Sequence, residues 1–457
     1  WTAGTGWQTL FTANPEPLEP LIRKGEFMEQ SQQQFQWYYV FSAKSLQRYI
    51  LHGNKLQLMI GASNLVERIP TELIPAMLET MNLAENRDFR ILSSTAGSIR
   101  ILFASEDSAR HLAEIVPLVM NQYAPGLEFV QHYQKMKDSI LDTMQEGEQA
   151  IQIRRNIRFP QYPLPGPLVK RNPRSGLAAV GMAYFGTDTE WMDAVSQAKK
   201  KAASDSTDIL MKKIFPEDFS NGEQNPVLEL EKLIENEGDY IAILHADANN
   251  MGNTITNILQ KIKHLQNEKI IEIYCRLTQA IETATRYAAH NAIKDINLNP
   301  NENLPVRPVV LAGDDFTLIL RAQDALKVAR EFLFSFEKKI EEEISKIEPN
   351  FLEKPKITAA AGIAFVHKNF PFSQAYQLCE SLCAYSKGKT NRAHSSIAFW
   401  RVTSSAMDDL EQLIERELCT KDGLQLTMMP YGIHPETNPS LSDLTVLVSA
   451  LKKMPRG

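Results

Sequence analysis

Two acidic turns, far apart in the sequence, are the strongest candidates for chemistry in this chain. The first lies within residues 240–252 and carries Asp247, and the second, AGDDF at 312–316, carries Asp314 and Asp315. Three carboxylates that converge repel one another, and burial raises their pKa values unless a cation compensates. Mg²⁺ or Mn²⁺ suits that role, because both ions prefer oxygen ligands and bridge carboxylates to phosphates. The pattern predicts that Asp247, Asp314 and Asp315 are metal ligands and catalytic residues for phosphoryl transfer.

Residues near these turns are candidates for binding a nucleotide. Gly313 allows a tight turn with no side chain in the way of a phosphate. Lys387 and Lys389, at the end of a predicted helix, could donate their ammonium groups to a β- or γ-phosphate. Lysines at a helix C-terminus also interact favourably with the helix dipole. We favour a functional role for Lys387 and leave Lys389 open. The predicted nucleotide-binding set is completed by Asn249, Gly252 and Ala312.

The second acidic turn also has a purely structural explanation. A glycine followed by two aspartates is common at hairpin tips, where the side chains only bond to the turn backbone. Taken alone, such a short motif favours that explanation, because short motifs match by chance. The matching strand context of Asp247 and the downstream Lys387 reverse the preference.

The elements that must position these turns follow a β-α-β-β-α-β order that occurs twice. In the first unit we predict strands at 37–41, 89–92, 98–103 and 127–131, with helical sequence at 43–83, 107–123 and 135–153. In the second we predict strands at 240–245, 308–312, 316–320 and 356–365 and an added edge strand at 396–400. We predict helices at 251–291, 324–347 and 373–387, the first of them with a break near Asn267. In such a unit the first strand lies beside the hairpin of strands two and three, which brings Asp247 next to Asp314 and Asp315.

The fold class that follows is α+β, with two ferredoxin-like domains, a proline-rich joint and a short helical C-terminal tail. Prolines concentrated at 159–173 disfavour both helix and central strand there. The predicted organisation is an N-terminal extension (1–35), a first domain without metal ligands (36–158), a linker or insert (159–237), a catalytic domain (238–402) and the tail (403–457).

Composition sets the broad class. The chain has 457 residues, 43% hydrophobic and 23% charged, which excludes a mostly disordered protein. Its apolar runs are too short to span a membrane. A net charge of −6 does not require a nucleic-acid partner. Four cysteines do not make a disulfide framework, so reduced thiols and a cytoplasmic location are expected. Cys379 and Cys383 lack a second pair nearby, which favours a buried pair over a zinc site.

Three further groups of polar residues have a structural and a functional interpretation. The lysines at 199–201 are interpreted as a solvated helix face, with phosphate binding as the alternative. His245 is interpreted as a packed or hydrogen-bonded histidine, with substrate contact as the alternative. Arg154, Arg155 and Arg158 form a basic run that favours a solvated face over a grip on RNA or on an acidic partner.

The two acidic turns resemble the second palm domain of Cas10 (also called Cmr2 or Csm1), the large subunit of type III CRISPR systems. That palm is similar to the nucleotide cyclase and polymerase palm of GGDEF proteins. The resemblance is carried by YIAILHADANNMG at 240–252 and VVLAGDDF at 309–316. In addition, FSAKSLQRY at 41–49 and IGASNLV at 60–66 resemble the opening of the family's first, metal-free palm.

The resemblance implies an enzyme that makes cyclic oligoadenylates from ATP, a second messenger in antiviral defence. It implies two Mg²⁺ or Mn²⁺ ions held by the three aspartates, with Lys387 facing the triphosphate. The first palm has STAGS at 94–98 in place of the acidic turn, and would supply a second nucleotide pocket or support. Expected partners are ATP or another nucleoside triphosphate and, as candidates, other CRISPR-type subunits, RNA or a second copy of the chain, but no membrane.

The chain also departs from the family pattern. Ala312 replaces the first glycine of the usual Gly-Gly-Asp-Asp motif, and Asn249 replaces a second acid. A methyl group at 312 is tolerated if φ is negative and damaging if φ must be positive. The family's zinc cysteines are absent from 170–176, so we expect no zinc. The sequence contains no His-Asp dipeptide, the pattern that marks the family's nuclease domain. Two alternatives therefore stay open: a silent nucleotide-binding scaffold or sensor, and a diguanylate-cyclase-like enzyme that uses GTP.

Overall fold

The computed structural model describes residues 35–53, 55–157, 165–185, 188–204, 209–216, 240–296, 304–347, 357–403 and 409–454. The chain divides into a unit of residues 1–34 and a compact unit of residues 35–457. The predicted N-terminal extension up to residue 34 lies outside the described residues. So do the first part of the proline-rich joint, 158–164, and most of the second half of the linker, 217–239.

The first sheet has four strands, all antiparallel to their neighbours, in the order β2-β3-β1-β4. The strands are β1 (Trp37–Ala43), β2 (Phe89–Thr95), β3 (Ser98–Phe103) and β4 (Phe129–Lys135). The helices are α1 (Leu46–Leu51), α2 (Leu56–Arg68), the π-helical turn η1 (Ile69–Leu73), α3 (Ile74–Thr80), α4 (Glu106–Tyr123) and α5 (Ile140–Arg155). Ser105 and Ser139 cap α4 and α5 by accepting bonds from backbone N–H groups of the first turn.

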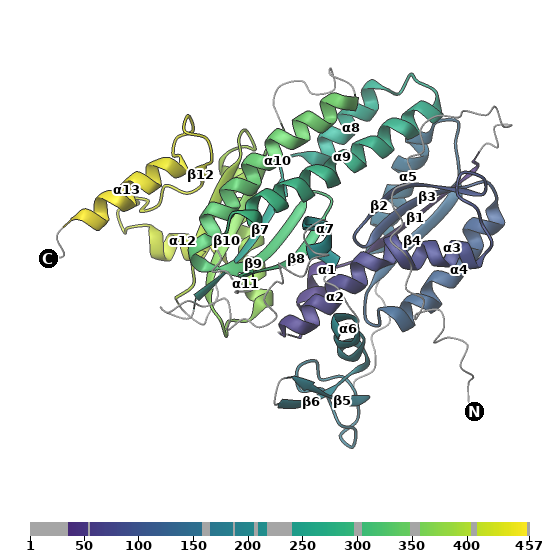
Figure 1. The fold of residues 1–457 in the computed structure, drawn as a ribbon, viewed down its shortest axis with the longest axis horizontal. Coiled ribbons are helices and arrows are strands. Elements are labelled where there is room, and N and C mark those ends of the chain that lie inside the picture. The colour runs from purple at the N-terminus through teal and green to yellow at the C-terminus, as the bar shows by residue number, and fades with distance from the viewer. Residues whose placement is uncertain are drawn as a thin grey trace. The chain divides into compact units, whose positions relative to one another are not determined.

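The insert contains a hairpin that was not predicted, followed by a helix at the predicted lysines 199–201. A two-stranded hairpin, β5 (Gly181–Phe185) and β6 (Asp188–Met192), precedes α6 (Ala194–Ser204) and α7 (Ile209–Ile214) (Figure 1). The prediction of a solvated lysine face at 199–201 is wrong for Lys199, which is 1% exposed. Its Nζ donates to the carbonyl oxygen of Tyr49 and lies 4.1 Å from the centre of that ring.

The second sheet has six strands in the order β12-β11-β10-β7-β9-β8. The strands are β7 (Tyr240–Ala248), β8 (Val306–Ala312), β9 (Asp315–Arg321), β10 (Ala359–His367), β11 (Ser396–Arg401) and β12 (Tyr431–Gly432). The helices are α8 (Met251–Lys261), α9 (Asn267–Lys294), the short 3₁₀ helix η4 (Ala322–Asp324), α10 (Ala325–Ile347) and α11 (Phe372–Lys389). The predicted break near Asn267 separates α8 from α9. Among the strands of the described residues, β10 and β11 are the one parallel pair, so the α+β class is confirmed.

The C-terminal tail is not entirely helical. It contains α12 (Leu410–Leu418) and α13 (Leu441–Lys453), but the segment between them supplies β12, which pairs with β11. The strand predicted as an edge at 396–400 is therefore flanked on both sides for part of its length. Among the described residues, no helix is both long and apolar enough to cross a bilayer.

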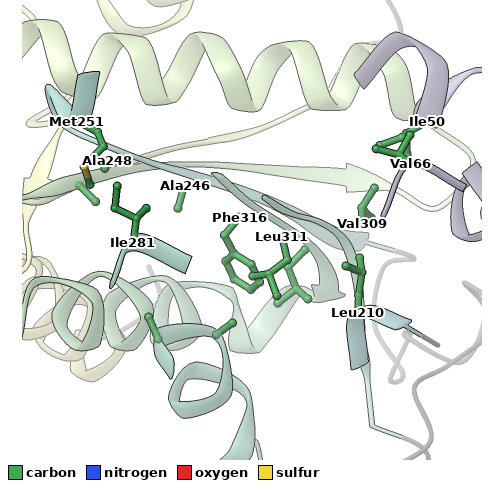
Figure 2. Packing of buried hydrophobic residues seen from close by; sticks show 14 of the residues in the cluster. Ile50, Val66, Leu210, Ala246, Ala248, Met251, Ile281, Val309, Leu311 and Phe316 are labelled. Carbon is green, nitrogen blue, oxygen red and sulfur yellow. The ribbon is translucent and has the colours of Figure 1, made fainter. Parts of the chain in front are cut away.

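One hydrophobic core runs through the first sheet, the insert and the second sheet. Figure 2 shows Ile50 and Val66 of the first sheet's helices, Leu210 of α7, and Val309 and Phe316 of the second sheet within the same cluster. A buried hydrogen bond crosses the same boundary, because Ser63 of α2 donates to the carbonyl oxygen of Val309 at 2.7 Å. The two sheets thus share one core.

Candidate active site

The centre of the second sheet brings the two acidic turns together. β7 lies between β10 and β9, and its last pair with β9 is Ala246 opposite Phe316. Asp247 and Asp315 each lie one residue beyond that pair, on neighbouring strands. The alternation of side chains along a strand puts both on the face covered by α11, while Phe316 points to the other face and stacks on Phe332 of α10. The predicted juxtaposition of Asp247 with the hairpin tip is present.

The hairpin tip is a two-residue turn. Ala312 pairs with Asp315, which leaves Gly313 and Asp314 as the loop residues. Gly313 has φ of +60°, a conformation that glycine adopts without strain, and a side chain there would meet no atom within 4 Å. Ala312 is a strand residue without positive φ, so its methyl group is compatible with the turn.

Burial and mutual repulsion raise the pKa values of two of the three aspartates. Burial, and then the negative charge of Asp247, raises the pKa of Asp314 to about 6. Burial, followed by the charges of Asp247 and Asp314, raises the pKa of Asp315 well above its ordinary range. The ammonium of Lys387 acts in the opposite direction on both groups. An excess of negative charge that one lysine offsets only in part is an environment that favours binding of a cation.

Helix α11 delivers Lys387 to this cluster. The helix packs so closely on β10 that a Cβ atom at Gly362 would lie 2.1 Å from the carbonyl oxygen of Cys379. From this position the nearly buried Lys387 forms an ion pair with Asp247 and donates to the carbonyl oxygen of Ala248 at 2.8 Å. Lys387 therefore binds the Asp247 carboxylate in this structure, and its contact with a phosphate stays a prediction.

The other predicted nucleotide-binding residues are placed differently. Lys389 is exposed, and its Nζ lies 5.6 Å from the centre of the Tyr385 ring. Asn249 is buried, and its side-chain amide donates to Thr358 at 2.8 Å, while its side-chain oxygen has no hydrogen-bond partner among the described residues. Gly252 is exposed in the first turn of α8, where Asn250 makes no side-chain cap. The N-cap residue therefore leaves the first N–H groups of α8 without its side-chain cap, and such groups can bind an anion.

His245 and the cysteine pair have structural contacts, whereas the arginine run is only partly described. His245 is buried, bonds Thr317 at 3.1 Å and packs edge-on against Tyr376, and burial lowers its pKa to about 4. Cys379 and Cys383 are buried free thiols that donate to backbone carbonyls, as predicted for a buried pair. Arg154 and Arg155 end α5, with Arg155 donating to Ser42 at 2.6 Å, and Arg158 lies outside the described residues.

One contact to the turn was not predicted. The hydroxyl of Thr285, in the middle of α9, donates to the carbonyl oxygen of Gly313 at 2.7 Å. No local sequence signal marks this residue, because the contact joins a helix to a turn that follows it much later in the chain.

The carboxylate oxygens of Asp247, Asp314 and Asp315 suit Mg²⁺ or Mn²⁺, although they do not yet surround a common point. Among the described residues, no three His, Cys, Asp or Glu side chains are already gathered as ligands of one ion. The three aspartates nonetheless supply only oxygen donors, and their crowding raises the pKa values of two of them. Because Lys387 contacts Asp247, a bound ion would require the carboxylates to turn toward a common point.

Comparisons with known proteins find one similar domain family and several structures of similar fold. Residues 240–396 match the family model for the second palm domain of Cas10/Cmr2. No curated protein matches the chain.

Similar solved structures include Csm1 from T. onnurineus (11% identity, TM-score 0.51, covering 79% of this chain and 53% of that one). An apo Csm1–Csm4 cassette has 11% identity and a TM-score of 0.51, covering 84% of this chain and 57% of that one. A Csm1–Csm4 cassette in complex with pppApApA has 10% identity and a TM-score of 0.50, covering 79% and 53%. This chain spans about half the length of the chains it matches. At identities this low, the structural likeness shows a shared fold and nothing more.

Proposed function

From the match of residues 240–396 to the family model for the second palm domain of Cas10/Cmr2, we propose that the chain is a metal-dependent nucleotidyltransferase. Its substrate would be ATP and its product a cyclic oligoadenylate that serves as a second messenger in type III CRISPR-like antiviral defence. The observation that carries this proposal is the convergence of Asp247, Asp314 and Asp315 beside Lys387. The strand order of both sheets, with the first strand of each unit beside the third, supports a pair of ferredoxin-like palms.

In the proposed reaction, a 3′ or 2′ hydroxyl of one nucleotide attacks the α-phosphorus of a second. The new P–O bond forms as the bond to the pyrophosphate breaks, and pyrophosphate leaves with the release of one proton. Asp247, Asp314 and Asp315 would hold Mg²⁺ or Mn²⁺, which lowers the charge on the attacking and leaving oxygens when bound. The open side of Gly313 leaves room for a phosphate next to these carboxylates.

Two cationic or dipolar groups of the chain would bind the triphosphate. The Lys387 ammonium, released from Asp247 once that carboxylate has another cation, lies within reach of the same space. The uncapped N-terminus of α8 begins four residues after Asp247 and offers backbone N–H groups together with the positive end of the helix dipole. Gly252 lies in that first turn and places no side chain over it.

A single assay tests the assignment. The protein is incubated with Mn²⁺ and each nucleoside triphosphate separately, and pyrophosphate release and product masses are measured. ATP should give pyrophosphate and oligoadenylates, and product from GTP alone would select the diguanylate-cyclase-like alternative. The Asp314→Ala, Asp315→Ala double variant should lose activity, whereas the exposed Asp422→Asn should retain it. Undiminished product from the double variant would show that the assignment is wrong.

A catalytically silent nucleotide-binding scaffold is the second candidate, and one observation favours it. Asn249 stands in place of a second acid and its amide is engaged by Thr358, so one fewer carboxylate is available to bind a metal. Calorimetric binding of ATP without release of pyrophosphate would select this candidate. Because a solved structure similar in fold is a Csm1–Csm4 cassette, the assay must be repeated with a co-purified Csm4-type subunit and RNA before silence is accepted.

A further inference from the structure

Helix α9 contacts the turn that carries Asp314 through one buried side chain. Thr285 is 1% exposed, and its hydroxyl lies 2.7 Å from the carbonyl oxygen of Gly313 and 3.0 Å from that of Ile281. The hydroxyl has one proton, so these two carbonyl oxygens compete for it. The contact with Ile281 is the one that helical threonines commonly make within their own helix. The shorter bond to Gly313 leaves the helix and reaches the tip of the β8–β9 hairpin.

This bond fixes the peptide plane between Gly313 and Asp314. A peptide unit is planar, so holding the Gly313 oxygen also sets the direction of the Asp314 N–H and Cα. In a two-residue hairpin turn, rotation of this central peptide interconverts the II′ and I′ forms. Gly313 permits both forms because it has no side chain, whereas the I′ form would require positive φ at Asp314, which the structure does not have. The hydroxyl of Thr285 therefore selects the form in which Asp314 keeps its present direction.

The helix that carries Thr285 is itself anchored to the rest of the protein. At its start, the side chain of Asn267 donates to the carbonyl oxygen of Asp138 at 2.8 Å. One turn before Thr285, Glu282 lies 3.7 Å from the ammonium of Lys213, which also pairs with the buried Glu67 of α2. Thr285 thus presents its hydroxyl from a helix held at several points rather than from a mobile loop.

We propose that Thr285 is a positioning residue that holds the Gly313–Asp314 peptide in the orientation that directs Asp314 toward Asp247 and Asp315. The inference rests on the proposed function of this site, because it assigns Thr285 a role in assembling the metal ligands. Loss of the hydroxyl frees the turn to rotate and disperses the carboxylates without removing any of them.

Three variants separate the hydroxyl from the volume of the side chain. Thr285→Val removes the donor and keeps the shape, and Thr285→Ser keeps the donor. Thr278→Val is the matched control, because the hydroxyl of Thr278 donates to the Cys275 carbonyl of its own helix. Two measurements are made on each full-length variant: hydrogen exchange of peptides covering 309–318, and Mn²⁺ binding to the nucleotide-free protein, followed by the spectroscopic signal of free Mn²⁺.

Thr285→Val should speed exchange in the hairpin peptides roughly fivefold, as expected for loss of one hydrogen bond, with exchange in β7 unchanged. It should weaken Mn²⁺ binding roughly tenfold or more, the usual effect of losing a group that orients metal ligands. Thr285→Ser and Thr278→Val should match the wild type in both measurements.

The outcomes distinguish this inference from the proposed function. If Thr285→Val matches the wild type in hairpin exchange and Mn²⁺ binding, or if Thr285→Ser fails as Thr285→Val does, the positioning role is refuted while the function stands. If exchange rises in Thr285→Val but the wild type neither binds Mn²⁺ nor releases pyrophosphate, Thr285 orients the turn and the proposed function is refuted.

Discussion

Replacing Asp314 with asparagine should make the metal-free protein more stable while abolishing its activity. Burial and the charge of Asp247 raise the pKa of Asp314 from 3.8 to about 6. A tenfold change in proton affinity corresponds to about 1.4 kcal/mol, so keeping Asp314 ionised costs the folded state at most roughly 3 kcal/mol. Because the side chain is partly exposed and solvent screens it, we expect asparagine to recover about 1–2 kcal/mol.

The pH dependence has a definite sign. The pKa of Asp314 is higher in the folded than in the unfolded protein, so the contribution of this group to stability is complete below about pH 4 and is lost as the pH rises through about 6. The advantage of Asp314→Asn should therefore be absent near pH 4 and complete above about pH 7. This behaviour would mark Asp314 as a residue kept for function at a cost in stability.

Thermal unfolding with a chelator present provides the measurement. At about pH 8, Asp314→Asn should raise Tm by about 2–4 °C. The exposed Asp422→Asn should leave Tm unchanged, and added Mn²⁺ should stabilise the wild type but not Asp314→Asn. A Tm equal to or below that of the wild type at about pH 8 would refute the reasoning, because it would show that the three carboxylates do not repel one another in the folded protein.

Three further results are expected elsewhere in the molecule. Burial lowers the pKa of Lys199 to about 7, so the Tm of the wild type should rise with pH above about 7. Lys199→Met keeps the packing on Tyr49 and should remove that rise in Tm. Gly362→Ala should destabilise the protein by about 1–3 kcal/mol in denaturant unfolding and lower activity, because the new methyl group would push α11 away from β10. An unchanged free energy of unfolding would contradict the close packing. Cys379 and Cys383 should resist a thiol reagent in the native protein while the other two cysteines react, which mass spectrometry of digested protein would check.

The strands and helices around the site could be predicted from local patterns. The hairpin of β8 and β9 and the start of β7 were predicted to within a few residues, because short apolar runs bounded by glycine and aspartate are local signals. The β5–β6 hairpin was not predicted, since its strand residues are largely exposed or half-buried and leave no buried apolar run. The burial of Lys199 was also missed, because three consecutive lysines have the pattern of a solvated face whichever one packs against Tyr49.

By itself, the sequence determined which residues could act and in what order the elements carry them: an aspartate after one strand, two aspartates at a hairpin tip and a lysine at the end of a helix. Tertiary structure alone decided that Lys387 pairs with Asp247 and that Thr285 holds Gly313. It also decided that Lys389 lies at the surface. The physical reason is that these contacts join segments far apart in the chain. Their geometry depends on how closely helices pack on the sheet, for which a pattern of neighbouring residues contains no signal.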